Sequence, residues 1–242
     1  MRLALPLFAI LACAGLARAD DIVPADAKLE KIFDAGRVLT EGVAVAPDGM
    51  VYFSDITFTH VAREKKQPVE AGHIWKLDPK TLKATIFRSP SGMSNGLKFD
   101  AEGNLLAAEG ADVGGRRVTK ADMKPGKAVI LAGVFEGRSL TAPNDITIDE
   151  KGRVYFSDPR YLGHEPIDQP VQAVYRVDPD GSIHRIVTDA GKCNGVAVSP
   201  DQKSLYVVSN DNGNTGIGRL PMDAPAKKGS SPARCQAPRA VP

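Results

Sequence analysis

The chain has 242 residues, of which 43% are hydrophobic and 25% are charged, and its formal net charge is +2. This apolar content is enough to build a sizeable core, which excludes a wholly disordered chain. The small net charge, with basic residues scattered along the sequence, argues against nucleic acid as a partner.

The N-terminal residues predict a signal for export. Arg2 precedes an apolar run over residues 3–16, and Ala17 and Ala19 provide the small residues of a cleavage site. The run is shorter than the roughly 20 residues of a transmembrane helix. We therefore expect residues 1–19 to be a signal peptide. The mature protein would then be periplasmic or secreted, with no membrane segment.

The cysteines give weaker indications. Residues 10–13 are a poor match to a bacterial lipoprotein box ending at Cys13. Beyond it only Cys193 and Cys235 remain, and two cysteines in an exported chain can pair. Because one lies in a repeated segment and the other in a Pro-rich tail, the sequence favours two unpaired thiols over a disulfide.

Short β-branched, aromatic and alternating apolar segments, separated by Asp, Gly and Pro turns, predict β-strands through most of the chain. A lone strand is predicted at residues 28–34, and four groups of strands follow. The predicted strands of the four groups are residues 43–46, 51–54, 73–78 and 84–88; 96–99, 105–109, 116–120 and 128–132; 145–148, 154–157, 173–178 and 183–188; and 195–198, 205–209 and 216–220.

A strand–turn–strand phrase recurs about every 50 residues, which is typical of propeller blades. Its clearest copy is residues 142–158. Unrelated hairpins are the weaker alternative, because the four copies share both turn and register. We therefore predict an all-β, β-propeller domain of about four blades over residues 20–220. Residues 221–242 lack apolar periodicity and are expected to be disordered.

The last predicted blade is incomplete. A closed propeller hides the edges of its sheets, whereas an open arc of about four blades exposes them. The sequence therefore suggests either a chain truncated near Leu220 or a propeller that closes by association, and the first is favoured.

Four oxygen-bearing residues begin the inner strands of the four blades. Glu41, Asn95, Asn144 and Asn194 occupy equivalent positions of the repeat, and such positions point to one mouth of a propeller channel. One carboxylate and three amide oxygens suit Ca²⁺ best, with Mg²⁺, Mn²⁺ and Zn²⁺ as alternatives. The competing interpretation is that each Asn only bonds its own backbone in an Asx turn.

The repeated phrases resemble the SMP-30/gluconolactonase/LRE-like family over roughly residues 29–211. The motifs that carry the resemblance are Glu41-Gly42, Asn95-Gly96-Leu97, Pro143-Asn144-Asp145, Tyr155-Phe156-Ser157-Asp158-Pro159 and Asn194-Gly195-Val196. The resemblance implies a six-bladed propeller with a divalent cation, commonly Ca²⁺, in its channel, and an enzyme that opens sugar and other lactones. By position it implies metal ligands at Glu41, Asn144 and Asn194, and a substrate or metal contact at Asn95.

The sequence departs from the family pattern at three places. After Leu220 it lacks the Pro-Asp-Gly phrase that usually supplies a further Asp ligand. Met93 stands where sugar-lactonase members often carry Arg, and Ala108-Glu109-Gly110 replaces a frequent Ala-Glu-His-Gly phrase. These departures leave the choice of lactone open.

The expected function is therefore a metal-dependent hydrolase acting on a small lactone or sugar-derived substrate. A cation would polarise the carbonyl, and a carboxylate would take a proton from water. Asp145 is the candidate base, with an N–H acceptor at the start of a strand as an equal alternative. Glu109 could bind sugar hydroxyls or lie in a surface turn. The rival functions are a non-catalytic propeller that binds a ligand or protein partner, and an inactive truncated family member.

Overall fold

The computed structural model describes residues 24, 26–34, 39–56, 66, 71–123, 127–211 and 214–222. The chain divides into two compact units, Met1–Ile32 and Phe33–Pro242. The described residues of the first unit form no strand or helix. The predicted signal peptide, Cys235 and residues 223–242 of the predicted tail lie outside the described residues. No helix with the length and hydropathy of a membrane span occurs in the described part of the chain.

The described part of the second unit is built from antiparallel sheets in which neighbouring strands follow one another in sequence. The first sheet contains β1 (Thr40–Val45), β2 (Val51–Asp55), β3 (His73–Asp78) and β4 (Lys83–Arg88), and the second contains β5 (Ser94–Phe99), β6 (Leu105–Glu109), β7 (Arg117–Ala121) and β8 (Ala128–Ala132). The third contains β11 (Ile146–Ile148), β12 (Val154–Asp158), β13 (Ala173–Val177) and β14 (Ile183–Val187), and the fourth contains β15 (Cys193–Val198), β16 (Ser204–Asp211) and β17 (Asn214–Pro221). A small hairpin of β9 (Val134–Phe135) and β10 (Arg138–Ser139) connects the second and third sheets.

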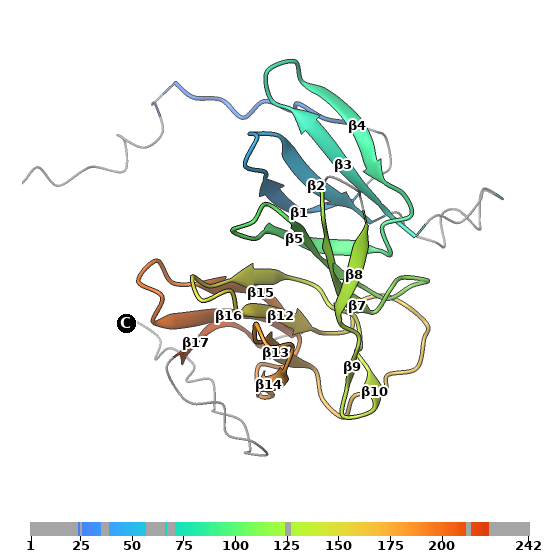
Figure 1. Cartoon of the computed structure of the whole chain (residues 1–242), viewed down its shortest axis with the longest axis vertical. Coiled ribbons are helices and arrows are strands. Elements are labelled where there is room, and N and C mark those ends of the chain that lie inside the picture. Colours follow the sequence, from blue (N-terminus) through green and yellow to red (C-terminus); the bar gives the residue numbers. More distant parts are fainter. Residues whose placement is uncertain are drawn as a thin grey trace, which may run out of the picture. The chain divides into compact units, whose positions relative to one another are not determined.

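The first strand of each sheet lies beside the first strand of the next. β1 contacts β5 (Figure 1), and the contacts continue from β5 to β11 and from β11 to β15. This succession of four meandering sheets around their first strands is a β-propeller arrangement, and it confirms the all-β fold predicted from the repeat. Each inner strand begins within two residues of one of the four oxygen-bearing positions.

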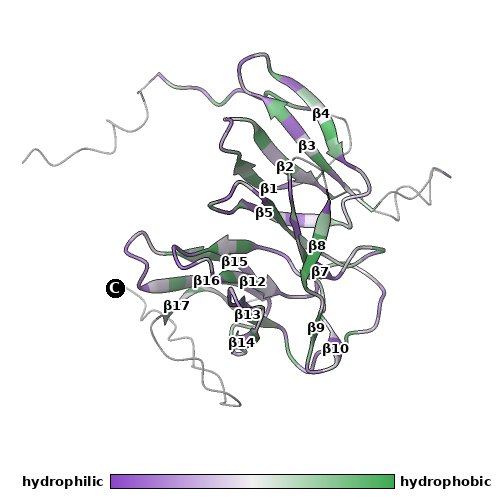
Figure 2. Ribbon diagram, in the orientation of Figure 1, coloured by the Kyte–Doolittle hydropathy of each residue, from purple (hydrophilic) through white to green (hydrophobic). Residues whose placement is uncertain are grey.

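The hydrophobic core is divided among the interfaces between successive sheets, and Figure 2 shows apolar residues concentrated in the strands. Strand β12 illustrates the alternation of side chains across a sheet. Tyr155 packs with Val174 and Leu205 toward the fourth sheet, whereas Phe156 packs with Leu106 toward the second. Because the third sheet is covered on both faces, all residues of β12 and β13 are buried.

The structure corrects the sequence-based boundaries at both ends. Residues 28–34 are not a strand, because Leu29 and Ile32, two of its alternating apolar residues, are exposed. Phe33 instead contacts the first sheet through its side chain, and its ring centroid lies 4.9 Å from that of Phe53. At the other end, β17 reaches Pro221, and Met222 is buried with its N–H donating to the Lys203 carbonyl at 3.0 Å. Ordered structure therefore extends two residues beyond the predicted end of the domain.

Candidate functional site

A pocket of about 290 Å³ is lined by residues of all four sheets and their connections. Its polar lining residues are Glu41, Asn95, Asn144, Tyr161, Asn194 and Asn210. The four side chains that the repeat predicted to converge therefore share one cavity. Their roles as metal ligands, and the role of Asn95 as a substrate or metal contact, stay predictions.

Irregularities in the strands position three of these residues. The pairing of β1 with β2 shifts register between Glu41 and Val43, and the pairing of β5 with β6 shifts between Ser94 and Leu97. The pairing of β15 with β16 shifts in the same way between Cys193 and Val196. Such β-bulges re-aim side chains and are common next to functional sites. Each bulge contains or adjoins one of the predicted ligands.

The glycines after Glu41 and Asn95 allow the inner strands to approach closely. The Gly96 N–H donates to the Asn144 carbonyl at 2.6 Å. A Cβ on Gly96 would lie 2.8 Å from that carbonyl oxygen. A Cβ on Gly42 would collide with the Asn95 carbonyl, and the φ of Gly42 is +38°, a conformation that side-chain-bearing residues rarely adopt. The glycines of the Glu41-Gly42 and Asn95-Gly96 pairs are thus required by the close packing of the backbone.

Asp145 connects the third and fourth sheets. Its Oδ2 accepts the Val196 N–H at 2.8 Å, and its own N–H donates to the Ser157 hydroxyl at 3.1 Å. That hydroxyl donates to the Asn194 carbonyl at 2.6 Å. Asp145 is not among the residues that line the pocket. Its position therefore favours the N–H acceptor over the catalytic base, although the chemical role of Asp145 is untested.

Substitutions at Asp145 separate these two roles. We expect Asp145→Asn to keep most of its stability and at least about a third of the wild-type activity, because the amide oxygen can still accept the Val196 N–H. Asp145→Ala should lose about 1–3 kcal/mol of stability, since a buried N–H loses its acceptor. Chemical denaturation and lactone turnover measure the two effects. An Asp145→Asn variant with unchanged stability and no turnover would identify Asp145 as the base.

The pocket carries a negative charge that fits a cation. Glu41 is exposed at the pocket, but partial burial of its carboxylate raises its pKa, and the nearby Asp145 carboxylate raises that pKa further. A cation between such groups would relieve their repulsion. No group of three or more His, Cys, Asp or Glu able to hold a metal occurs in the described ranges. A cation here would therefore depend on Glu41 together with amide oxygens, a donor set suited to hard divalent ions.

Glu109 does not belong to the pocket. Its side chain is only 2% exposed and is enclosed by Arg88 at 2.8 Å, Arg117 at 2.7 Å and the Thr119 hydroxyl at 2.8 Å. Both carboxylate oxygens are thus occupied by partners from β4 and β7. The side chain therefore lies in the interface between the first two sheets, away from the pocket lining, and its role as a substrate contact stays a prediction.

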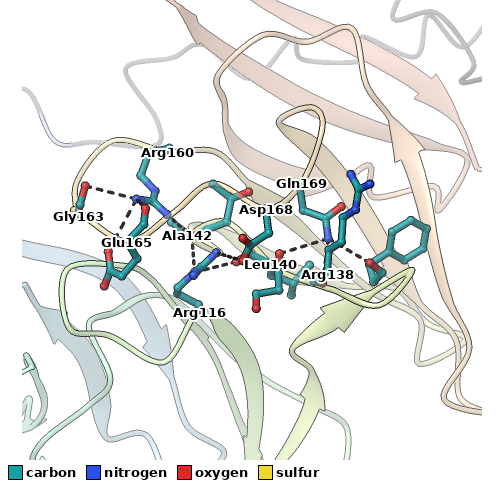
Figure 3. A network of polar contacts seen from close by, with 12 residues as sticks. Arg116, Arg138, Leu140, Ala142, Arg160, Gly163, Glu165, Asp168 and Gln169 are labelled. Atoms are coloured by element: carbon teal, nitrogen blue, oxygen red, sulfur yellow. Dashed lines mark hydrogen bonds and ion pairs between the residues drawn. The ribbon is translucent and has the colours of Figure 1, made fainter.

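A second polar network holds the segment that leads into β11. The guanidinium groups of Arg116 and Arg160 both donate to the Thr141 carbonyl, at 3.2 and 3.1 Å (Figure 3). The Asp158 carboxylate accepts the N–H groups of Thr141 and Ala142 at 2.8 and 2.7 Å. Burial raises the pKa of Asp158 to about 6. These contacts fix the backbone just before the pocket residue Asn144.

Sequence reasoning missed two of the polar lining residues. Tyr161 lies in the connection between β12 and β13, and its hydroxyl donates to the Lys192 carbonyl at 3.3 Å. The same hydroxyl interacts with Asn194 and Asn210, while burial raises the pKa of Tyr161. The length of this connection was the available signal, because loops of more than about 12 residues are often functional. Asn210 lies near the C-terminal end of β16, and no sequence motif marked it as a candidate.

The chain is similar in sequence to lactone-hydrolysing proteins. The family model of the SMP-30/gluconolactonase/LRE-like region matches residues 115–234. This chain belongs to the SMP-30/gluconolactonase/LRE-like family. A gluconolactonase of Zymomonas mobilis is 31% identical over 149 residues, which are 59% of this chain and 40% of that protein. The chain thus spans about two fifths of the length of this curated relative.

Two solved structures of gluconolactonase-type proteins are similar in fold. A proposed gluconolactonase superimposes with a TM-score of 0.71 at 27% identity, covering 87% of this chain and 69% of the other. A gluconolactonase from Xanthomonas campestris superimposes with a TM-score of 0.65 at 25% identity, covering 78% of this chain and 60% of the other. The SMP-30/gluconolactonase/LRE-like fold is therefore shared over most of the present chain.

Proposed function

We propose that this SMP-30/gluconolactonase/LRE-like chain carries the pocket of a hydrolase that opens a small lactone. The observation that carries the proposal is that Glu41, Asn95, Asn144 and Asn194 line one cavity. The gluconolactonase relatives support lactones as the substrate class. The apolar N-terminal run with its small-residue cleavage site supports a periplasmic or secreted location.

We propose further that Glu41, Asn144 and Asn194 would hold a divalent cation in this pocket. Ca²⁺ is the first choice because the donors are one carboxylate and neutral amide oxygens, and Mg²⁺, Mn²⁺ and Zn²⁺ are the alternatives. When bound, the cation would supply Lewis acidity toward the lactone carbonyl. Asn95, on the neighbouring inner strand, would contact the substrate or complete the donor set.

The proposed reaction is the addition of water across the ring ester. The water oxygen bonds to the acyl carbon, the bond between that carbon and the ring oxygen breaks, and a proton passes from the water to the released oxygen. The product is a hydroxy acid. The chain's own contribution is to hold the ester against a set of donors whose spacing is fixed by the backbone contacts between the sheets.

Calorimetry and turnover test the proposal together. We expect Ca²⁺ to bind the purified chain with a measurable heat, and D-glucono-δ-lactone or an alkyl lactone to be hydrolysed in its presence. A chelator should lower kcat/KM at least about 100-fold, since a Lewis acid supplies several kcal/mol of transition-state stabilisation. If titration with Ca²⁺ produced no heat, the proposal that this cation binds in the pocket would be contradicted. Binding of a lactone without turnover would support the non-catalytic alternative.

A further inference from the structure

The pocket has an apolar part as well as a polar part. Its larger apolar lining residues are Leu39, Ile56, Met93 and Leu162. Leu39 and Ile56 flank the first two strands and are joined by a bond from the Ile56 N–H to the Leu39 carbonyl at 2.9 Å. Ile56 and Met93 are 6% and 2% exposed, whereas Leu39 and Leu162 are 41% and 38% exposed. Two of these side chains are therefore buried at the pocket, and the other two are open to solvent.

Met93 has an unusual backbone conformation. Its φ is +57°, in the left-handed region that glycine adopts at little steric cost and other residues adopt rarely. The conformation is held from both sides, because the Met93 N–H donates to Ala71 at 2.7 Å and the Met93 carbonyl accepts the Gly110 N–H at 2.9 Å. A long apolar side chain thus occupies a position where the backbone alone would favour glycine. Strain of this kind often accompanies a functional role.

Three of the four larger apolar lining residues gather at the first and second sheets. Leu39 and Ile56 flank the first two strands and Met93 precedes β5, whereas Leu162 lies in the connection that follows β12. A hydroxyl group placed against the apolar side chains would lose its hydrogen bonds to water without replacement. An alkyl group placed there would be removed from water favourably.

We propose that this pocket selects lactones that carry an apolar substituent over polyhydroxylated sugar lactones, with Met93 and Leu162 as specificity-determining residues. The inference rests on the proposed lactonase function. The ester of the substrate lies among the carboxylate and amide groups, and its alkyl substituent lies along Ile56, Met93 and Leu162. The bond changes are those of lactone hydrolysis for either class of substrate.

The test compares kcat/KM for γ-nonalactone and D-glucono-δ-lactone, with the full chain in CaCl₂. We expect the wild type to favour γ-nonalactone by at least about 10-fold, the discrimination that a few methylene groups provide in an apolar pocket. Met93→Gln keeps the length of the side chain and should lower this preference about 10-fold, chiefly through the KM of γ-nonalactone. Met50→Gln is the matched control, because Met50 packs against the core between the first two sheets outside the pocket lining.

Two results would overturn the proposal: a wild-type preference for D-glucono-δ-lactone, or a preference that Met93→Gln and Leu162→Asn both leave unchanged. Leu162→Asn is the second variant in case Met93→Gln fails to fold. Leu162 is partly exposed, so a polar side chain there should leave the fold intact. If neither lactone is hydrolysed, the proposed function fails, and calorimetric titration of both lactones decides the specificity. Tighter binding of γ-nonalactone that Leu162→Asn weakens supports the inference, and equal or absent binding contradicts it.

Discussion

Glu41→Gln is expected to weaken Ca²⁺ binding at least about 100-fold and to lower kcat/KM by a similar factor, because the affinity of a hard-oxygen site follows its ligand charge. Glu41 is the acidic side chain among the described residues that line the pocket. The substitution keeps the size of the side chain and removes only the charge. Calorimetric titration with Ca²⁺ and lactone turnover measure the two losses separately.

The matched control for this substitution is Glu136→Gln. Glu136 is exposed and pairs with Arg185 at 3.3 Å in the hairpin region, outside the pocket lining. We expect this variant to bind Ca²⁺ and hydrolyse lactone as the wild type does. A Glu41→Gln variant that retained wild-type Ca²⁺ affinity would show that the cation, if one binds, does so elsewhere.

Glu109→Ala should produce the largest loss of stability, about 3–5 kcal/mol, because removing one partner of a buried ion pair leaves the other charge uncompensated. The Arg88 side chain is 20% exposed and would keep its charge in a buried position, whereas Arg117 is 41% exposed and can turn toward water. Burial already lowers the pKa of Arg88, and the Glu109 carboxylate opposes that change. Denaturant unfolding monitored by circular dichroism measures the difference in free energy of unfolding.

Glu102→Ala provides the comparison at a surface position. Glu102 is 71% exposed and its oxygen lies 3.9 Å from the Lys120 ammonium. Its loss should change the free energy of unfolding by less than about 0.5 kcal/mol, as for most exposed pairs. If Glu109→Ala were as stable as Glu102→Ala yet raised the KM for a sugar lactone, the assignment of Glu109 as a substrate contact would be supported.

Four of the polar pocket residues were predictable from the sequence because they follow the repeat, whereas Tyr161 and Asn210 do not. The turns and β-branched segments locate the strands closely, so Glu41 and Asn194 could be aligned across distant copies before their contacts were known. The hairpin β9–β10 was missed, since its two-residue strands are too short to show an alternating pattern.

The buried ion-pair cluster around Glu109 was missed for a different reason. The alternation of side chains along a strand shows which residues share a face. It does not show which side chains of other strands they meet, and Glu109 is the last residue of β6. Its partners Arg88 and Arg117 lie on strands of different sheets, 21 and 8 residues away in sequence. Such a cluster is specified by tertiary contacts, which no local pattern reveals.

The close contacts between successive inner strands have a consequence for ion selectivity. The Gly96 N–H joins its backbone directly to the Asn144 carbonyl, and the fully buried Ser157 hydroxyl holds the Asn194 carbonyl. The main-chain positions of Asn144 and Asn194 are therefore fixed relative to the neighbouring strands. If the proposed cation binds there, these fixed positions would restrict the ionic radii that the side-chain oxygens can reach together.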